Sequence, residues 1–323
     1  MGRYLIRRTL FLILVLFVVS VVTFIIFFKL PAGDPARLSA GRRTTEAALE
    51  EVRHNLGLDR PWYIQYGRFA KGLIPLPGFF LNEQVYFSYS NNVPVSEEIY
   101  QRLPVTAVLA LGSAAIWLVM GVSIGIISAI RRGGIPDRVG TLFALFGVSA
   151  PVFWLGYLFL YIFWYKLRIA PESGIPPNEP LLASVLHGRF VLPWMTLALA
   201  FAAFYSRMTR SNLIETMGED YIRTARAKGL SERTVTYKHG LRAALTPVVT
   251  IFGLDLGLLL GGAVITETVF NLPGLGQYVI QSLFNNDFPA VMGVTIFASM
   301  FVMVANLVVD VSYAILDPRV RYS

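Results

Sequence analysis

Residues Glu219–Pro247 read EDYIRTARAKGLSERTVTYKHGLRAALTP, and this stretch carries six of the chain's 28 Lys and Arg residues. It lies between stretches that are almost free of charge. Only 15% of the 323 residues are charged and 55% are hydrophobic, whereas about 25% charged residues is usual for a soluble domain. The charged stretch therefore has to be explained together with the apolar sequence around it.

Long apolar runs make up most of the remaining sequence. Their lengths suit helices that cross a bilayer, which need roughly 17–25 apolar residues. They do not alternate between polar and apolar residues as the strands of a membrane barrel would. We therefore predict an all-α integral membrane protein with six transmembrane helices. The runs are Thr9–Phe28, Leu103–Ile130, Val139–Tyr165, Phe190–Ser206, Ala243–Glu267 and Pro289–Val309.

The first apolar run follows the basic leader GRYLIRR at Gly2–Arg8, which a secretory signal peptide would also have. Signal peptides have an apolar region of about 7–15 residues that ends in a cleavage site with small residues. The run here is longer and is followed by FFKLPAGDP at Phe27–Pro35. We expect a retained membrane helix.

Basic residues predict the orientation of the helices, because cytoplasmic loops carry an excess of Lys and Arg. With the N-terminus inside, the eight basic residues between Arg207 and Arg242 fall in one inner loop. Both termini are then expected in the cytoplasm. This topology also accounts for the net charge of +8, so the charge gives no reason to expect nucleic-acid binding.

The predicted topology divides the chain into four parts. They are a cytoplasmic end with the first helix (1–30), an extracytoplasmic segment (31–101), a core of five helices with the inner loop 207–242 (102–316), and a cytoplasmic tail (317–323). Within the extracytoplasmic segment, the pattern of Thr44–Leu58 predicts an amphipathic helix and that of Gly78–Val95 predicts short strands.

Small residues and one proline mark positions inside the predicted helices. Gly253, Gly257 and Gly261 are spaced by four, and this spacing lets two helix backbones approach closely in a membrane. We interpret them as helix-packing residues. Pro151 is expected to kink the third helix.

Catalytic and metal-binding patterns are missing from the sequence. His54, His187 and His239 lie outside the apolar runs, and there is no cysteine, so neither a Ser–His pair in the membrane nor a thiolate site is expected. The chain also has no Gly-x-x-x-x-Gly-Lys-Ser/Thr loop for the phosphates of ATP. We predict no catalytic residue, no metal site and no cofactor in this chain, and energy for transport would have to come from another polypeptide.

Asp255 is the acid that lies deepest in an apolar run, and such acids can serve ion or proton relays. Two interpretations are open. It could line the substrate pathway and meet a cationic group of a substrate, which a self-contained secondary transporter or channel could also use, or it could bond to a neighbouring helix. A single deep acid is a weak basis for a relay, so the second interpretation is favoured.

The first part of the charged stretch predicts a short helix. Glu219 and Asp220 suit its N-terminus, because negative charge there complements the helix dipole. Arg223, Arg226 and Lys228 place positive charge toward its C-terminus for the same reason.

A turn and a second helix are expected next. Gly229 would end the first helix in a left-handed conformation, with Leu230 as the accompanying hydrophobic contact. Ser231 would then cap the following helix. Two other interpretations are less favoured. A solvated basic loop would not require a helix cap, a helix-ending glycine and a second helix cap in this order. A DNA-binding helix-turn-helix does not fit the membrane context. A surface helix joined to membrane helices could instead transmit movement from a partner.

Residues Tyr221–Thr250 resemble the "EAA" coupling loop of binding-protein-dependent ABC importer permeases, in particular the first permease subunit of the oligopeptide/dipeptide/nickel family. The Glu-Ala-Ala of that loop falls on Arg223, Thr224 and Ala225, and its Gly falls on Gly229. The Glu and the first Ala are therefore replaced in this chain.

The resemblance extends over nearly the whole chain. The other stretches that carry it are LPAGDP (30–35), LGLDRPWYIQYGRF (56–69), RLPVT (102–106), GGAVITETVFNLPGLGQ (261–277) and NLVVDVSYAILDPRVRYS (306–323).

The resemblance implies a type I importer permease core (MetI-like) that pairs with a second, homologous permease subunit. Two ATPase subunits, which bind ATP and Mg, would dock on the coupling loop, and an extracytoplasmic solute-binding protein would deliver the substrate. Di- or oligopeptides are the expected cargo, with glutathione and nickel chelates as alternatives. The protein would lie in the cytoplasmic (inner) membrane of a bacterium or archaeon, in contact with lipid. The expected coupling residues are Glu219, Asp220, Arg223, Thr224, Ala225, Arg226, Ala227, Lys228, Gly229 and Leu230.

Overall fold

The chain is helical wherever the structure describes regular secondary structure. The computed structural model describes residues 2–29, 58–74, 85–88 and 90–316, together with the single positions 46, 50, 54 and 81. Among these residues, strand-like pairing is limited to one antiparallel bridge between Phe87 and Pro94. The predicted all-α fold class is confirmed at this level.

The segment 31–101 differs in part from the sequence-based expectation. In the described part of Gly78–Val95 the strand-like pairing is limited to the bridge between Phe87 and Pro94, and the rest of this stretch lies outside the described residues. The chain instead turns tightly, because Asn92 adopts a φ of 57° and its N–H donates to the carbonyl of Ser88 at 3.0 Å. The helix expected at Thr44–Leu58 lies almost wholly outside the described residues.

The described residues form two compact units. One comprises those up to Thr106, Gly257–Val264 and those from Pro273 onward; the other comprises Ala107–Leu256 and Ile265–Leu272. Three helices contribute residues to both units: α5 (Val95–Ile130), α13 (Thr246–Leu260) and α14 (Val264–Val269).

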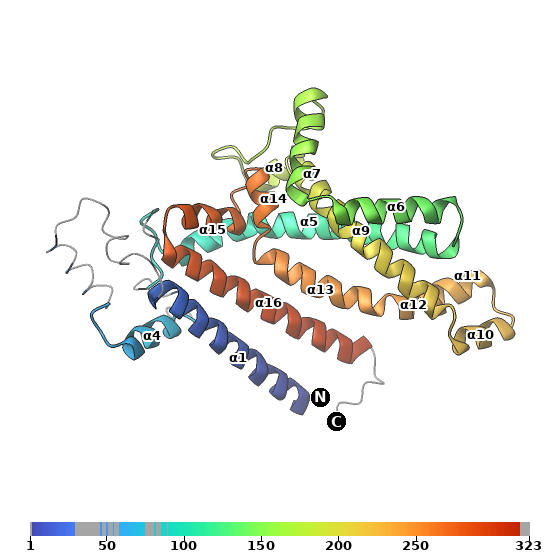
Figure 1. Cartoon of the computed structure of the whole chain (residues 1–323), viewed down its shortest axis with the longest axis horizontal. Coiled ribbons are helices and arrows are strands. Elements are labelled where there is room, and N and C mark those ends of the chain that lie inside the picture. The colour runs from blue at the N-terminus through green and yellow to red at the C-terminus, as the bar shows by residue number, and fades with distance from the viewer. Residues whose placement is uncertain are drawn as a thin grey trace. The chain divides into compact units, whose positions relative to one another are not determined.

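In the first unit, two long helices lie side by side. α1 runs along α16, α15 also packs against α16, and α4 packs against α1 (Figure 1). Ser20 of α1 and Tyr66 of α4 hydrogen-bond at 2.8 Å. The buried carboxylate of Asp287, just before α16, accepts hydrogen bonds from the hydroxyl of Ser88 and the N–H of Ser90. The elements are α1 (Gly2–Phe24), η1 (Ile25–Lys29), α4 (Trp62–Lys71), α15 (Leu275–Phe284) and α16 (Phe288–Leu316).

In the second unit, α9 is the central element, and α6, α7 and α12 all pack against it. The buried indole of Trp117 in α5 stacks on Phe201 of α9 at 4.6 Å between ring centroids. Trp194 of α9 donates to the carbonyl of Val108 in α5 at 3.0 Å. The elements are α6 (Ile135–Ser149), α7 (Val152–Phe159), η2 (Leu160–Lys166), α8 (Leu181–Leu186), α9 (Val191–Thr216), α10 (Asp220–Ala227), α11 (Glu232–Thr234), η3 (Val235–Gly240) and α12 (Leu241–Ala244).

Four described helices are long and apolar enough to cross a membrane. Two further pairs of helices, each bent at a short break, are long and apolar enough when the two helices of a pair are taken together. The four are Arg7–Phe27, Val95–Ile130, Val191–Thr216 and Phe288–Val308. The pairs are Ile135–Ser149 with Val152–Lys166, bent by 102°, and Glu232–Ala244 with Thr246–Leu260, bent by 44°. The structure thus contains several membrane-length apolar helices, and the number reaches six if each pair is one span.

The third apolar run is two helices, not the one kinked helix that the sequence predicted. The residue before a proline disfavours the helical conformation, and Ala150 is extended, with φ −81° and ψ 121°. The chain restarts at Pro151, whose carbonyl accepts the N–H of Leu155 at 3.1 Å. The fifth run is also interrupted, because α13 ends at Leu260 and Gly262 has a φ of 129°.

Two glycines of α13 lie directly against α16. A Cβ added at Gly257 would lie 2.4 Å from the Cβ of Ala305, and one added at Gly261 would lie 2.9 Å from the Cβ of Ala298. Gly253, the third residue of the predicted set, is half-buried. Two of the three positions therefore have no room for a side chain unless α16 moves.

We expect Gly257→Val to lower the thermal unfolding temperature of the detergent-purified protein, because overpacking typically costs about 1–3 kcal/mol. Gly257→Ala should have a smaller effect, and a second substitution, Ala305→Gly, should restore most of the loss by removing the methyl group that it meets. Full stability of Gly257→Val without any compensating change would contradict this packing.

Candidate functional site

Residues Glu219–Leu230, the predicted coupling residues, form a short helix and the turn that ends it. Glu219 precedes α10 in an extended conformation, with φ −69° and ψ 150°. Its carbonyl accepts the N–H groups of Ile222 and Arg223 at 3.1 and 3.2 Å. The ion pair between Asp220 and Arg223 is 3.4 Å long and its side chains are 97% and 73% exposed, so it contributes little stability.

α10 has one apolar side and one uncovered side. Ile222 and Ala225 are buried and pack with Val235 of η3 and with Met217. The remaining side chains of α10 are exposed: Asp220, Tyr221, Arg223, Thr224, Arg226 and Ala227. Among the ten predicted coupling residues, Ala225 thus faces the protein itself, and the charged residues face outward.

The turn after α10 has the expected left-handed glycine. Gly229 has a φ of 76°, and a Cβ added there would meet no atom within 4 Å. The N–H of Gly229 donates to the carbonyl of Arg226 at 2.9 Å, and the N–H of Leu230 donates to that of Ala225 at 3.4 Å. These bonds end the helix in the manner typical of glycine caps. Leu230 itself remains 40% exposed.

The second helix begins where the sequence indicated, and an ion pair joins the two helices. The hydroxyl of Ser231 accepts the N–H of Thr234 at 3.4 Å. Arg226 binds Glu232 through two hydrogen bonds of 2.8 and 3.3 Å. The hydrogen bond to Glu232 raises the pKa of the Arg226 guanidinium above its usual value. This pair was not predicted from the sequence, although only the short turn separates its two residues.

The charged segment is attached to the helical bundle at two places. η3 packs against α10 and α12, and α12 packs against α9. Gly240 in η3 lies close to the C-terminal end of α9. A Cβ added at Gly240 would lie 2.8 Å from the sulfur of Met217, the residue that follows α9. Asn212 of α9 donates to the carbonyl of Ala244 at 3.3 Å. A displacement of α10 would therefore be transmitted both to α9 and to the segment that continues into α13.

Asp255 is bonded to a neighbouring helix. The hydroxyl of Tyr205 in α9 donates to its carboxylate at 2.8 Å. Tyr205 is fully buried, and its ring lies 6.2 Å from that of Trp117. This geometry favours the packing interpretation of Asp255 over the interpretation as part of an ion passage.

A second polar pair in the same unit was not anticipated from the sequence. Asp137, at the start of α6, receives two hydrogen bonds from the Arg210 guanidinium, at 2.6 and 2.9 Å. The N–H of Gly133 also donates to it at 2.9 Å. The pair attaches the turn between α5 and α6 to the end of α9. Its α9 member, Arg210, is two residues before Asn212. The sequence signal was an acid three residues after the Gly133–Gly134 pair, but its partner is 73 residues away.

Two family models match the chain. Residues 121–322 match the binding-protein-dependent transport system inner membrane component, and residues 1–110 match the N-terminal part of the membrane component of such systems. Together the two matches cover almost the whole sequence.

Curated relatives match over their full length. The glutathione transport system permease protein GsiC of Pectobacterium atrosepticum is 41% identical over 322 residues, and the protein of the same name from Escherichia coli K12 is 40% identical over 322 residues. In both cases the match covers 100% of this chain and 100% of the relative.

A solved structure has a similar fold. A chain of the MetNI methionine ABC transporter, in an inward-facing conformation, aligns with a TM-score of 0.54 at 19% identity, covering 69% of this chain and 97% of its own. At this level of identity the similarity concerns the fold alone.

We expect Gly229→Ala to weaken the end of α10, because a left-handed non-glycine residue costs about 1–2 kcal/mol. Amide hydrogen exchange at residues 219–230 should accelerate by about fivefold or more, and Gly229→Asn should have a smaller effect because Asn tolerates this conformation. Gly67→Ala in α4 is the control, since a Cβ there also meets no atom within 4 Å but needs no left-handed φ. Equal exchange in Gly229→Ala and wild-type protein would contradict the cap.

We also expect Arg210→Lys to lower thermal stability nearly as much as Arg210→Met. A lysine cannot make the two-pronged contact with Asp137, and hydrogen bonds to charged groups contribute about 1.5–3 kcal/mol. When Asp137 is also replaced by Asn, the difference in thermal stability between the protein with Arg210 and the Arg210→Lys variant should become smaller. A lysine variant as stable as wild type would show that the paired geometry is unimportant.

Proposed function

Because the chain belongs to the family of inner membrane components of binding-protein-dependent transport systems, we propose that it is the permease subunit of an ATP-driven importer. The match over the full length of curated permeases carries this proposal. The exposed, capped helix α10 supports it, because a chain without an ATP-binding loop needs a surface on which an ATPase can act.

The proposed cargo is a small peptide. The relatives at 40% and 41% identity are named for the transport of glutathione, which is itself a short peptide. Di- and oligopeptides share with glutathione an extended backbone and charged ends. We assign the choice among them to the separate solute-binding protein that meets the substrate first.

In the proposed topology the chain crosses the bacterial inner membrane six times and has both termini in the cytoplasm. Four membrane-length helices and two bent pairs support the number, and the basic residues of 207–242 support the orientation. The parts of the chain are then the first helix with its cytoplasmic end (1–30), the extracytoplasmic segment (31–101), the core (102–316) and the cytoplasmic tail (317–323).

The proposed mechanism is alternating access driven by partner subunits. Two ATPase subunits carry ATP and Mg and dock on the exposed side of Glu219–Leu230, and a second homologous permease completes the pathway. Closure of the ATPases on ATP would displace α10, and its attachments to α9 and α12 would pass this movement into the bundle. Nucleotide would thus favour one of two conformations through its differential affinity for them.

The alternative function is a self-contained secondary transporter or channel that uses Asp255. Its carboxylate is already engaged by Tyr205 at 2.8 Å, which weakens this alternative. It predicts uptake by the chain alone, which the importer proposal excludes.

We expect Ala227→Arg to weaken ATPase binding about tenfold, corresponding to about 1.4 kcal/mol. Ala227 is on the exposed side of α10, so the added guanidinium would obstruct a docked partner without disturbing the buried contacts of Ile222. Co-purification of the ATPase subunits and peptide-stimulated ATP hydrolysis in liposomes are the measurements.

The matched control is Ala243→Arg, the same substitution at an exposed position of α12 outside the proposed docking residues, which should leave both measurements near wild type. Peptide uptake by this chain alone, driven by an ion gradient, would contradict the importer proposal. Equal effects of the two substitutions would contradict docking at α10.

A further inference from the structure

The break between α6 and α7 leaves backbone groups without hydrogen bonds. Within the part of the chain that the structure describes, no hydrogen bond reaches the carbonyls of residues 148–150, and the N–H groups of residues 152–154 donate none. Pro151 has no N–H to donate. Leu155 is the first residue after the break whose N–H finds a partner, the carbonyl of Pro151 at 3.1 Å. Main-chain acceptors are therefore free before Pro151, and main-chain donors are free after it.

This break lies deep in an apolar run. The charged residues that flank the run are Arg138 and Lys166, and none lies between them. At 1.5 Å per residue, α6 rises about 18 Å from Arg138 to Ala150, and it packs against α9, which is itself long enough to cross a membrane. Half of a hydrocarbon core is about 15 Å thick. In the proposed topology the free groups are thus near the middle of the bilayer.

Lipid cannot satisfy these groups. An unpaired N–H or C=O group is costly in hydrocarbon, because nothing there can hydrogen-bond to it. A membrane protein tolerates non-helical backbone at this depth only where other protein buries it or where it borders water. The exposed side of the break therefore faces one of these two surroundings and not the acyl chains.

An open cavity of about 350 Å³ lies at the break. A single water molecule needs roughly 10–15 Å³, so the cavity has room for a group of waters. Ser149 and Pro151 are exposed beside it, and Phe153 is 51% exposed. Both helices and the turn between them line the cavity, through Phe146, Ser149, Ala150, Pro151, Phe153 and Trp154.

Water fits the chemistry of the break better than a second polypeptide does. A covering polypeptide would have to supply donors to residues 148–150 and acceptors to residues 152–154 in matching positions, whereas each water molecule both donates and accepts. The hydroxyl of Ser149 also makes no hydrogen bond within the described chain. The hydroxyls of Ser113 and Ser206, by contrast, donate to carbonyls of their own helices at 2.7 and 2.8 Å. A serine hydroxyl that leaves these carbonyls unused is expected where water is at hand.

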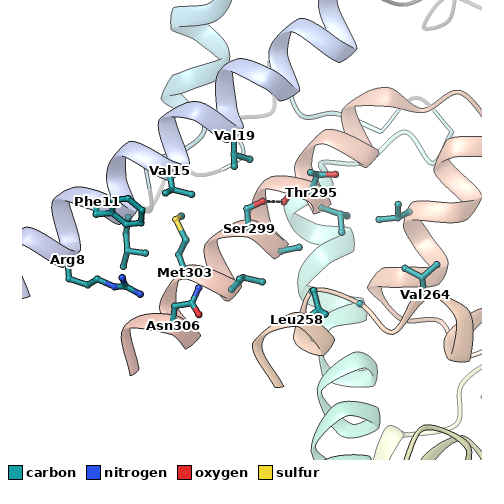
Figure 2. Close-up of a pocket in the computed structure, with 17 residues that line it drawn as sticks. Arg8, Phe11, Val15, Val19, Leu258, Val264, Thr295, Ser299, Met303 and Asn306 are labelled. Carbon is teal, nitrogen blue, oxygen red and sulfur yellow. Dashed lines mark hydrogen bonds between the residues drawn. The ribbon is translucent and has the colours of Figure 1, made fainter. Parts of the chain in front are cut away.

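The larger cavity of about 600 Å³ between α1 and α16 is different (Figure 2). The walls that these two helices form are continuous helix, so their backbone groups bond within each helix. The hydroxyl of Thr295 donates to the carbonyl of Val291 at 2.7 Å, and that of Ser299 donates to the carbonyl of Thr295 at 2.8 Å. These two walls therefore give no comparable reason to expect water.

We propose that the break at Pro151 borders the water-filled pathway through which the cargo crosses the membrane. The inference rests on the proposed permease function and names one part of the wall of that pathway. Free main-chain groups hydrogen-bond to water and to any peptide main chain, so such a wall does not select among side chains. That property suits a permease whose selectivity lies in a separate binding protein.

The test introduces a single cysteine into the assembled transporter in nanodiscs. The chain has no cysteine of its own, so Ser149→Cys, which exchanges an oxygen for a sulfur, places one thiol at the break. The probe is a membrane-impermeant, sulfonated methanethiosulfonate, which reacts with the thiolate and therefore only where water reaches the thiol. Mass spectrometry of this subunit measures the modification rate, without nucleotide and with ATP and vanadate.

Val119→Cys is the matched control. Val119 is 70% exposed and is as far from Arg131 along α5 as Ala150 is from Arg138 along α6, but its backbone lies inside a continuous helix. In at least one of the two nucleotide states, Ser149→Cys should react at least tenfold faster than Val119→Cys. A smaller ratio in both states would overturn the proposal. A cross-link from Ser149→Cys to another subunit in place of modification would also overturn it, because protein would then cover the break.

Hydrogen exchange tests the wild-type protein without any substitution. The N–H groups of residues 152–154 should exchange at least tenfold faster than those of residues 117–121 in α5, because they are free and in contact with water. Free N–H groups that lipid or protein covers would exchange slowly. Equal exchange rates of the two segments would overturn the proposal.

Uptake of radiolabelled dialanine into liposomes separates this inference from the proposed function. Modification of Ser149→Cys should slow ATP-driven uptake at least fivefold, because the added group narrows the pathway, whereas the same treatment of Val119→Cys should leave uptake unchanged. Unchanged uptake after complete modification of Ser149→Cys would overturn the inference and leave the proposed function intact. Uptake that does not require ATP would contradict the proposed function, while the modification rates would still decide whether water reaches the break.

Discussion

The structure depends on the need of a membrane-embedded backbone to satisfy its own N–H and C=O groups. Water is absent from the hydrocarbon core, so an apolar stretch has to be helical there, and each interruption has to be satisfied locally. The break at Pro151 shows this requirement, because the proline carbonyl immediately accepts the N–H of Leu155. The same constraint explains why the described chain is helical although much of its apolar sequence is rich in β-branched residues.

The charged segment Glu219–Pro247 does not have to satisfy its backbone groups in the absence of water. Its local structure is determined by helix caps and turn residues that are close together in the sequence. α10 has only eight residues, too few for a stable isolated helix. Its caps and the burial of Ile222 against Val235 hold it in place. Because η3 and α12 continue directly from the turn, the segment is mechanically part of the bundle while its charged side remains uncovered. This combination suits a surface that receives a force from a partner.

Two polar pairs of the second unit connect helices and have a different role from catalytic groups. Tyr205 with Asp255, and Arg210 with Asp137, each join α9 to another helix. Asp255 lies in an apolar run, where a polar side chain is costly unless it is paired, and Tyr205 is its partner. Arg210 and Asp137 pair at the end of α9, outside the apolar runs. They make α9 the element through which the parts of the second unit are connected.

The sequence alone determined the helical class, the charged segment with its caps at Gly229 and Ser231, and the family resemblance that the comparisons confirmed. These features depend on composition and on residues close together in the chain. Tertiary structure decided the 102° bend at Pro151, the partners of Asp255 and Asp137, and the cavity between α1 and α16. A proline indicates that a helix is disturbed but not by what angle. Partners 50 and 73 residues apart meet because of how whole helices pack, which no local pattern encodes.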